Sequence, residues 1–207
     1  MNGTLLSANV SQIRHEIHDG EIVATGIFKK PVEGRIPVRG VNMRGDDQAD
    51  RENHGGPYRA LYAYASEDYL WWEKRLRRSL TPGTFGENLT SRDIDVSGAL
   101  IGERWSIGNT VVQVTSPRVP CYKLGITMND KGFVREFAQA ARPGVYLSIV
   151  TEGDVGAGDE IRSVSCPTHS LTIERMFRIY MFERGRLEEL LVPELPPYWR
   201  TWVLERT

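Results

Sequence analysis

One cysteine lies in a segment that could hold a reactive thiol. Cys121 is part of SPRVPCYKLG, residues 116–125, where two prolines and a glycine keep it out of the interior of a regular helix or strand. Arg118 and Lys123 are close in sequence, and nearby cations lower the pKa of a cysteine and favour the nucleophilic, metal-binding thiolate. A buried cysteine that only fills space is the commoner case, and these residues alone favour it. Both interpretations stay open at this point.

A second segment could bind an anion. In NHGGPYRAL, residues 53–61, the turn Gly55-Gly56-Pro57 predicts exposed backbone N–H groups, and Arg59 follows directly. Backbone donors beside an arginine suit a phosphate or a carboxylate. The segment lacks the lysine-serine pair of a Walker A loop. Taken alone, it is better explained as an ordinary hairpin turn.

A third segment, FGENLT, spans residues 85–90. Gly86 permits a positive φ, while Glu87 and Asn88 would present a carboxylate and an amide to a ligand. On its own this pattern is more typical of a bulge or of the start of a strand.

Short strands must position these segments. Between residues 1 and 165, β-branched and aromatic runs alternate with glycine and proline. Strands are predicted at residues 5–10, 21–28, 36–41, 60–65, 104–109, 110–116 and 144–150. Because no helices alternate regularly with these runs, the pattern argues against a doubly wound parallel sheet. It favours a mainly β fold, a barrel or a folded antiparallel sheet.

Helices are expected to interrupt and to follow these strands. Residues 66–78 predict a helix with Ser66 as its N-cap, and a second helix is expected near residues 130–142. Beyond Cys166 the pattern becomes helical, with helix starts expected near Thr172 and Pro197. We therefore expect two parts, a barrel domain over residues 1–166 and a short helical subdomain over residues 167–207.

Composition excludes several classes of protein. The 207-residue chain has a net charge of -1, so charge gives no reason to expect nucleic acid binding. No apolar run approaches the roughly 20 residues that a membrane span needs. The N-terminus does not resemble a secretory signal, and the two cysteines give no disulfide framework, so we expect a cytoplasmic protein. The cysteine outside the first segment, Cys166, has no cationic neighbours and is predicted to be structural.

Four segments together resemble one known family in order and spacing. They are GDDQADRENHGGPYRALYAY, PGTFGENLT, GERWSIGNTVVQVTSPRVPCYKLG and GDVGAGDEI. The chain resembles the MOSC family, named for the molybdenum cofactor sulfurase C-terminal domain, and looks most like its stand-alone bacterial YiiM-like branch. The resemblance is strong over residues 1–165 and looser over the C-terminal helices. It implies a MOSC-type β-barrel with a few interrupting helices and a small C-terminal helical appendage.

The resemblance also implies a cofactor and an activity. Members of the family bind the molybdenum cofactor, a molybdopterin, and the family's cysteine ligand to molybdenum maps onto Cys121. A soft thiolate suits such a metal. The YiiM-like branch implies reduction of N-hydroxylated compounds, such as hydroxylaminopurines, to amines. The chain has no flavin or haem signature, so electrons would come from a separate reductase.

Roles for the other residues follow from this resemblance. The cofactor phosphate is expected to contact Arg59, Arg118, Lys123 and the turn of Gly55 and Gly56, with Lys30 and Arg44 as further candidates. The pterin edge is expected to contact Asp46, His54 and Asn88, and Glu87 could instead hold one of the arginines. A general acid must protonate the departing oxygen, and the candidates are Tyr122 and His54.

Alternatives remain open at this stage. The chain could be a non-catalytic molybdenum cofactor or sulfur carrier, or an insertion protein that hands the cofactor on. A homodimer is possible if Trp199 and Trp202 form an exposed face on the helical tail.

Overall fold

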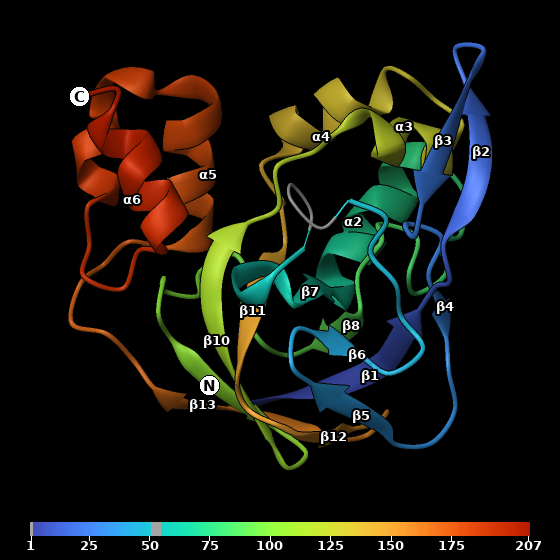
Figure 1. The fold of residues 1–207 in the computed structure, drawn as a ribbon, viewed down its shortest axis with the longest axis horizontal. Helices are drawn as coiled ribbons and strands as arrows, with labels where there is room; N and C mark the ends of the chain where they lie inside the picture. The colour runs from blue at the N-terminus through green and yellow to red at the C-terminus, as the bar shows by residue number, and fades with distance from the viewer. Residues whose placement is uncertain (1, 51–54) are drawn as a thin grey trace.

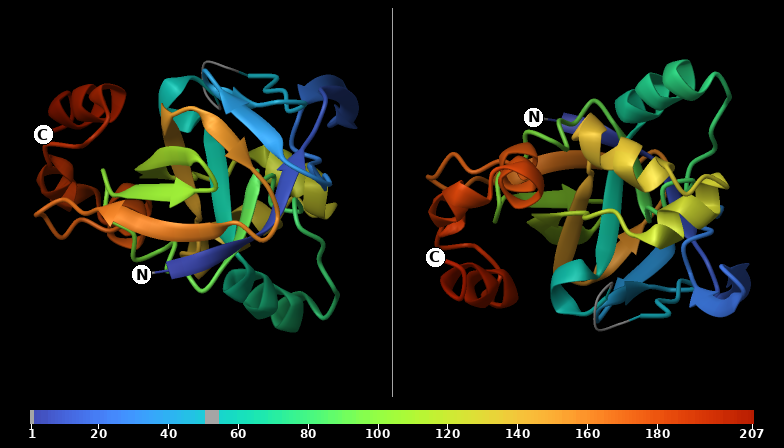
Figure 2. Two further views of the ribbon diagram at one scale, coloured as in Figure 1. Left: turned by 90° about the horizontal axis from the view of Figure 1, so that it is seen from below. Right: turned by 90° about the horizontal axis from the view of Figure 1, so that it is seen from above.

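The strands of the computed structural model, which describes residues 2–50 and 55–207, form a closed barrel (Figure 1). Among these residues, seven strands pair in the order β13-β9-β10-β11-β7-β8-β1, and β1 pairs back with β13. Figure 2 shows this ring of strands from two opposite sides. The barrel strands are β1 (Asn2–Val10), β7 (Leu61–Ala65), β8 (Leu89–Arg92), β9 (Arg104–Ile107), β10 (Thr110–Pro117), β11 (Val145–Thr151) and β13 (Glu160–Ser165).

Smaller pieces of sheet border the barrel. β4 (Lys30–Pro31) pairs with the end of β1. β12 (Gly153–Val155), β5 (Ile36–Arg39) and β6 (Asn42–Met43) form a three-stranded sheet. β2 (Arg14–His18) and β3 (Glu21–Thr25) form a hairpin that projects beside α3 (Figure 1).

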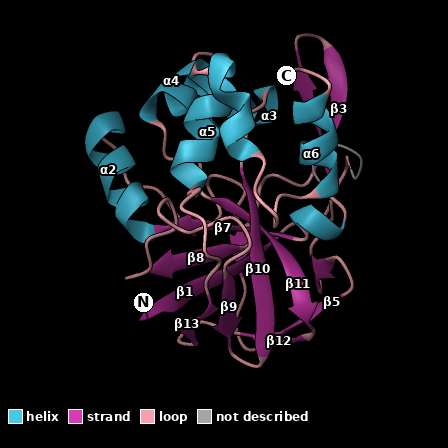
Figure 3. Ribbon diagram, turned by 90° about the vertical axis from the view of Figure 1, so that its left-hand side faces the viewer, coloured by secondary structure: helices cyan, strands magenta, loops and turns pink. Residues whose placement is uncertain are grey.

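The helices gather towards one end of the barrel (Figure 3). They are the α-helices α2 (Ser66–Leu76), α3 (Tyr122–Met128), α4 (Phe133–Ala140), α5 (Ile173–Phe182) and α6 (Pro197–Leu204), with 3-10 turns at η1 (Pro57–Arg59) and η2 (Arg184–Leu190). No helix in the described part of the chain is long and apolar enough to cross a membrane.

Side chains that point alternately to the two faces of each strand form the core of the barrel. Val112 and Val114 of β10 are fully buried, while Gln113 between them is only partly buried, because successive side chains of a strand point to opposite faces. The buried core of the barrel includes Leu5, Trp105 and Leu147 from three other strands.

A second, aromatic cluster holds α2, α3 and α4 on the barrel. Trp72 is fully buried, and its ring lies parallel to Phe137, with centroids 5.9 Å apart. Its indole nitrogen donates a 2.8 Å hydrogen bond to the Tyr64 hydroxyl, which satisfies the one polar atom of the ring. Leu124 of α3 belongs to the same cluster, so these contacts also fix the helix that follows Cys121.

The C-terminal helices share the core of the barrel. Met176 and Ile179 of α5 and Val203 of α6 are fully buried in the same hydrophobic cluster as the barrel strands. The cluster therefore spans both sides of the expected boundary at residues 166–167, which follows directly after β13.

Comparison with the sequence analysis confirms the mainly β barrel with interrupting helices and a helical tail. Thr172 caps α5 by accepting a hydrogen bond from the Arg175 amide at 3.1 Å, and Pro197 is the first residue of α6, both near the predicted starts. The expected N-cap at Ser66 is wrong: Ala65 takes that position, and the Ser66 hydroxyl instead contacts the side chain of the adjacent Glu67.

A buried carboxylate ties together the segment that precedes β8. Glu87 is fully buried and accepts hydrogen bonds from two amides, Gly83 at 2.7 Å and Phe85 at 3.2 Å. The hydroxyls of Tyr69 and Thr90 also donate to it. Burial raises the pKa of Glu87, and the hydrogen bonds from Tyr69 and Gly83 oppose that rise.

Substitution of this carboxylate should weaken the fold. In Glu87→Gln, an amide N–H₂ group replaces an acceptor oxygen among donors, so at least one buried donor loses its partner. We expect the free energy of unfolding to fall by about 2 kcal/mol, measured by chemical denaturation. The exposed Glu188→Gln is the control and should change by less than about 0.5 kcal/mol. Equal denaturation midpoints for wild type and Glu87→Gln would show that the network contributes little.

Candidate functional site

Cys121 lies where two adjoining hollows meet. The first, here called the basic hollow, is lined by Lys29, Arg59, Arg118, Cys121, Lys123, Tyr62 and Tyr146 among others. The second, the aromatic hollow, is lined by Tyr180, Tyr198, Trp199 and Trp202 of the C-terminal helical segment and by residues 117 and 119–121. Arg59, Cys121 and Tyr146 line both. The empty volumes, open mouths included, are about 610 and 860 Å³.

The end of β10 places the thiol at this junction. The strand stops at Pro117, and Cys121 is the N-cap of α3, with an extended backbone at φ −127° and ψ 171°. Its carbonyl accepts a 3.0 Å hydrogen bond from the Leu124 amide. Cys121 is half-buried. The sequence analysis did not predict α3, but it placed Cys121 correctly outside the interior of a regular element.

Arg118 is the most deeply buried cation of the basic hollow. It is 4 % exposed, and its guanidinium lies 5.8 Å from the Tyr62 ring centroid and 5.4 Å from that of Phe137. Its Nη1 atom has no hydrogen-bond partner among the described residues. Burial lowers the pKa of Arg118, but the nearby Tyr62 and Cys121 more than offset this, so the pKa is raised overall. Because an unpartnered buried donor is costly, this atom indicates an acceptor that the described residues do not provide.

Lys29 brings a second cation to the basic hollow. Its ammonium pairs with the buried carboxylate of Asp46, and burial lowers the pKa of Lys29 while Asp46 opposes that change. Asp46 also accepts hydrogen bonds from the Ser11 amide at 2.9 Å and from the side-chain amide of Asn88 at 3.0 Å. The Asp46 carboxylate is therefore held within the protein, behind Lys29.

Glycines allow two loops to approach each other closely beside Lys29. Gly83 and Gly86 have φ values of 90° and 79°. A Cβ on Gly83 would lie 2.4 Å from the Lys29 carbonyl oxygen, and one on Gly86 would lie 2.7 Å from the Ile27 side chain. Only glycine fits these positions without displacing the segment that carries Lys29.

Arg59 lies at the boundary of the two hollows. It ends the short turn η1, and its guanidinium is 4.7 Å from the ring centroid of Tyr198 and 6.0 Å from that of Tyr146. Its backbone carbonyl accepts a hydrogen bond from the Gln48 side chain at 3.2 Å. The turn begins at Gly56, whose φ of 83° is readily adopted only by glycine.

The structure brings some of the expected site residues together and separates others. Five line the basic hollow: Arg59, Asn88, Arg118, Cys121 and Lys123. Seven described residues are not part of its lining: Lys30, Arg44, Asp46, Gly55, Gly56, Glu87 and Tyr122. The remaining expected residue, His54, lies outside the described residues.

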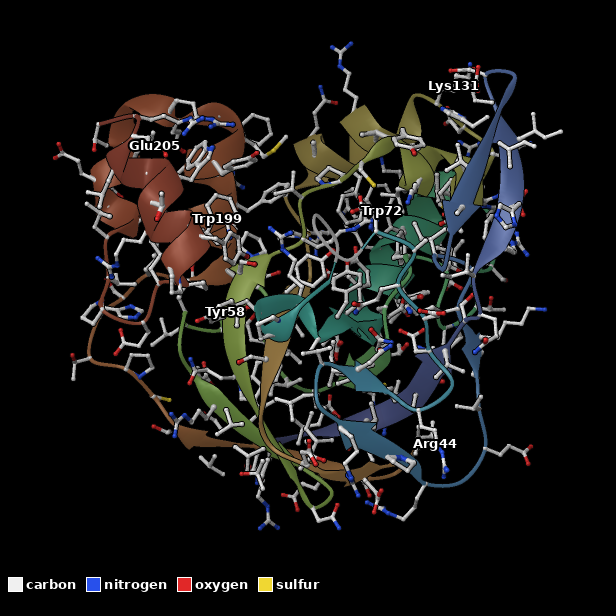
Figure 4. The ribbon with its side chains drawn as sticks, in the orientation of Figure 1. Arg44, Tyr58, Trp72, Lys131, Trp199 and Glu205 are labelled. Carbon is white, nitrogen blue, oxygen red and sulfur yellow. The ribbon has the colours of Figure 1, made fainter. Side chains whose placement is uncertain are left out.

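For four of the residues that do not line the basic hollow, the local structure gives the reason. Glu87 is turned into the network of donors below β8 rather than towards an arginine. Tyr122 is 47 % exposed and stacks on His18 of the β2–β3 hairpin, with ring centroids 5.2 Å apart. Lys30 is exposed on β4, while Arg44 is exposed and lies at the end of the barrel far from the helices (Figure 4).

Sequence reasoning missed several lining residues. Lys29 and Lys30 are adjacent, and only the paired structure shows that Lys29 faces the basic hollow. Tyr146 was part of a predicted strand and Trp202 part of a predicted helix, and neither was predicted to line a site. The only signal in the sequence that could have indicated a place in the site is a hydroxyl or an indole within an otherwise apolar segment.

The donor set suits a ligand that is anionic and brings its own metal ligands. No group of three or more His, Cys, Asp or Glu side chains that could hold a metal ion occurs in residues 2–50 and 55–207. Cys121 can contribute one soft sulfur ligand, and the cations around it can neutralise an anion.

Comparisons with known proteins show the family to which the chain belongs. The MOSC domain family model matches residues 50–162. The uncharacterized protein YflK of Bacillus subtilis is 34% identical over 176 residues, which cover 85% of this chain and 80% of YflK. Protein YiiM of Escherichia coli is 30% identical over 159 residues, 72% of this chain and 71% of YiiM.

Two further similarities concern a longer protein and a solved structure. A protein named "Reductase" from Gibberella moniliformis is 26% identical over 185 residues, which cover 85% of this chain but only 32% of the fungal protein. The crystal structure of YiiM from Geobacillus stearothermophilus superposes with a TM-score of 0.81 at 26% identity, covering 99% of this chain and 98% of that one. The match to the family model and these similarities confirm the resemblance seen in the sequence: the chain belongs to the MOSC domain family, in its YiiM-like branch.

Proposed function

We propose that the protein uses a bound molybdenum cofactor to reduce N-hydroxylated compounds to amines. The net reaction takes R–NHOH, two electrons and two protons to R–NH₂ and water, so the N–O bond breaks and the oxygen leaves as water. The observation that supports this proposal is the position of Cys121 between two hollows. A protein that only stored or delivered a cofactor would need the basic hollow alone.

The basic hollow fits the molybdenum cofactor. The cofactor carries a phosphate, and the unpartnered Nη1 atom of Arg118 offers a buried donor for an anion. Lys29, Arg59 and Lys123 line the same hollow together with Asp47 and Asp50, so with Arg118 the cations around that anion outnumber the carboxylates. The Cys121 thiolate would bind the metal, which is the preference expected of a soft ligand. When bound, the cofactor supplies the two-electron chemistry that removes the oxygen from the substrate.

The side chains at the junction have separate tasks in this proposal. The Arg118 cation near Cys121 favours the thiolate form, which is the form that binds metals. Burial raises the pKa of Tyr146, which lines both hollows, so its phenol stays protonated and can donate a hydrogen bond to the substrate oxygen. Tyr146 is better placed for this task than Tyr122, which is exposed and outside both hollows.

Electrons would come from a separate reductase. The described residues offer no motif for a flavin or a haem, and the fungal relative named "Reductase" is about three times longer than the matched region. That name supports a role in reduction. The donor protein, its contact surface and a homodimer remain proposals. Of the two tryptophans whose exposed face could support a homodimer, Trp199 is buried and Trp202 is partly buried, and both line the aromatic hollow.

Replacing each cysteine tests the metal ligand. In protein from a host that makes the cofactor, wild type should contain about one molybdenum per chain. Cys121→Ala should lose the metal or the activity because no second thiolate adjoins the basic hollow in the described chain. The matched control is Cys166→Ala, at an exposed position, which should keep both. Metal analysis, pterin fluorescence and reduction of 6-hydroxylaminopurine by reduced viologen measure these outcomes, and full activity of Cys121→Ala would contradict the proposed ligand.

Replacing the buried arginine tests the anion site. Arg118→Met keeps the apolar stem of the side chain and removes its charged guanidinium, so cofactor content should fall by at least about tenfold, as the loss of a charge-assisted hydrogen bond implies. The free energy of unfolding without cofactor should stay equal or rise, since an unpartnered buried donor disappears. The control is the exposed Arg44→Met, with unchanged cofactor content. Wild-type cofactor content in Arg118→Met would refute the role of Arg118.

The carrier alternative predicts a different result. Cofactor-loaded protein would then reduce no N-hydroxylated compound with reduced viologen, yet would transfer its cofactor to a cofactor-free enzyme faster than cofactor free in solution does. A persulfide on Cys121 without molybdenum would instead identify a sulfur carrier.

A further inference from the structure

We propose that the exposed, C-terminal part of α2 is the docking surface for the electron donor, a carrier protein with an acidic face. This surface, here called the α2 face, consists of Leu70, Lys74, Arg75, Arg77 and Arg78. The inference rests on the proposed reduction and adds the place where its electrons enter the molecule. No residue of the α2 face lines either hollow.

The helical repeat places these side chains together on the outside of the molecule. Leu70 and Lys74 are four residues apart on α2, so they lie on the same side of the helix, and Arg77 and Arg78 follow directly after its last residue. Leu70 is 58 % exposed, and all four cations are exposed. In Figure 3, α2 lies at the outer flank of the barrel. Arginines around an exposed apolar side chain are common where one protein contacts another.

Most cations of the α2 face lack a carboxylate partner in the described part of the chain. Among these residues, Lys74, Arg77 and Arg78 form no ion pair. Arg75 pairs with Glu136 of α4. The helix dipole stabilises cations near a helix C-terminus, but this effect is small for exposed groups and does not require four of them.

The carboxylates near this face are few, and backbone amides hold two of them. Glu73 accepts a 2.8 Å hydrogen bond from an amide beyond the helix. The Arg78 guanidinium lies 3.5 Å from the sulfur of Met128, two residues before Asp130, whose carboxylate accepts a hydrogen bond from its own turn. With the paired carboxylate of α4 and the exposed Arg135 beside it, five cations face three carboxylates, although the whole chain has a net charge of -1. The acidic residues of the first turn of α2 lie at its opposite end. Such a face attracts an acidic protein surface and steers its approach.

Packed rings connect the α2 face with the basic hollow. The partly buried Trp71 contacts Trp72 edge-on, with ring centroids 4.8 Å apart, and Trp72 is 6.0 Å from Phe85, which lines the basic hollow. Arg75 and Arg142 lie over the Trp71 ring, at 5.6 and 5.0 Å from its centroid, so a partner contacts the guanidinium groups and not the ring. Because electrons tunnel faster through closely packed atoms than across gaps, a donor bound here has a continuous route to the cofactor site.

The donor supplies electrons only. For each R–NHOH, two one-electron carriers are oxidised and two protons are taken from the solvent, and the products are R–NH₂ and water. A plant-type ferredoxin, which is a small acidic one-electron carrier, is the probe for this docking surface.

The first test measures electron transfer. In the cofactor-loaded protein, KM for reduced ferredoxin should rise at least about tenfold in Lys74→Glu/Arg77→Glu at low salt, because like charges repel. Molybdenum content and turnover with reduced viologen should stay at the wild-type level. The difference in KM should disappear at about 1 M salt, where charges are screened beyond about 3 Å. The matched control is Arg44→Glu/Arg104→Glu, which makes the same change of charge at exposed positions outside α2 and should keep the wild-type KM.

The second test needs neither cofactor nor turnover. A carbodiimide joins a lysine directly to a carboxylate that touches it. Of the five lysines of the chain, Lys74 is the one on the α2 face, so it should be the main site coupled to ferredoxin, as mass spectrometry of the peptides would show. Coupling should fall at least about tenfold in Arg77→Glu/Arg78→Glu and stay unchanged in Arg44→Glu/Arg104→Glu. Denaturation curves establish that each variant is folded.

The outcomes separate this inference from the proposed reduction. Viologen-driven reduction of 6-hydroxylaminopurine with an unchanged KM for ferredoxin in Lys74→Glu/Arg77→Glu would overturn the docking surface and leave the reduction standing. Coupling at Lys74 that depends on the two arginines, without turnover by the wild type, would support the docking surface and refute the reduction. Coupling mainly at Lys123 or Lys131, or no coupling at all, would also overturn the docking surface. Binding to anionic vesicles that is lost in the variant, with an unchanged KM for ferredoxin, would assign the α2 face to a membrane instead.

Discussion

The end of strand β10 is the constraint on which the site depends. β10 pairs with β9 on one side and with β11 on the other, and its last residue, Pro117, lies opposite Val145. Pro120 has no backbone N–H, so the chain cannot continue the ladder beyond that point. The residues that follow must leave the barrel wall, and they supply a buried cation at Arg118 and a thiol at Cys121 within four positions.

Local sequence patterns predicted the elements better than the directions of the side chains. The barrel, the helical tail and five lining residues of the basic hollow followed from strand propensity, helix signals and the resemblance to MOSC proteins. Side-chain direction depends on pairing, which is why Lys29 rather than Lys30 faces the hollow. Glu87 belongs to a distinctive motif, yet its task is to accept hydrogen bonds from its own loop and neighbouring strand, a set of partners that exists only after folding.

The site combines two chemically different surfaces. Four cations, two carboxylates and a thiol are among the groups that line the side that faces the barrel, and rings line the side that faces the tail. Arg59 belongs to both, with its guanidinium near the Tyr198 ring. In the proposed function the basic hollow holds the cofactor, and the aromatic hollow adjoins it at Cys121. The match to the family model, residues 50–162, falls on the barrel side of this division.

The shared hydrophobic cluster limits how the tail can move. Met176, Ile179 and Val203 are fully buried together with the barrel strands, so swinging the helices outward as a hinged cover would expose apolar surface at a cost of about 25 cal/mol per Å². The helices are therefore held on the barrel, and the walls of the aromatic hollow keep their positions. Rotations of single side chains such as Trp202, which is only partly buried, expose far less apolar surface and are the motions that remain open to this part of the molecule.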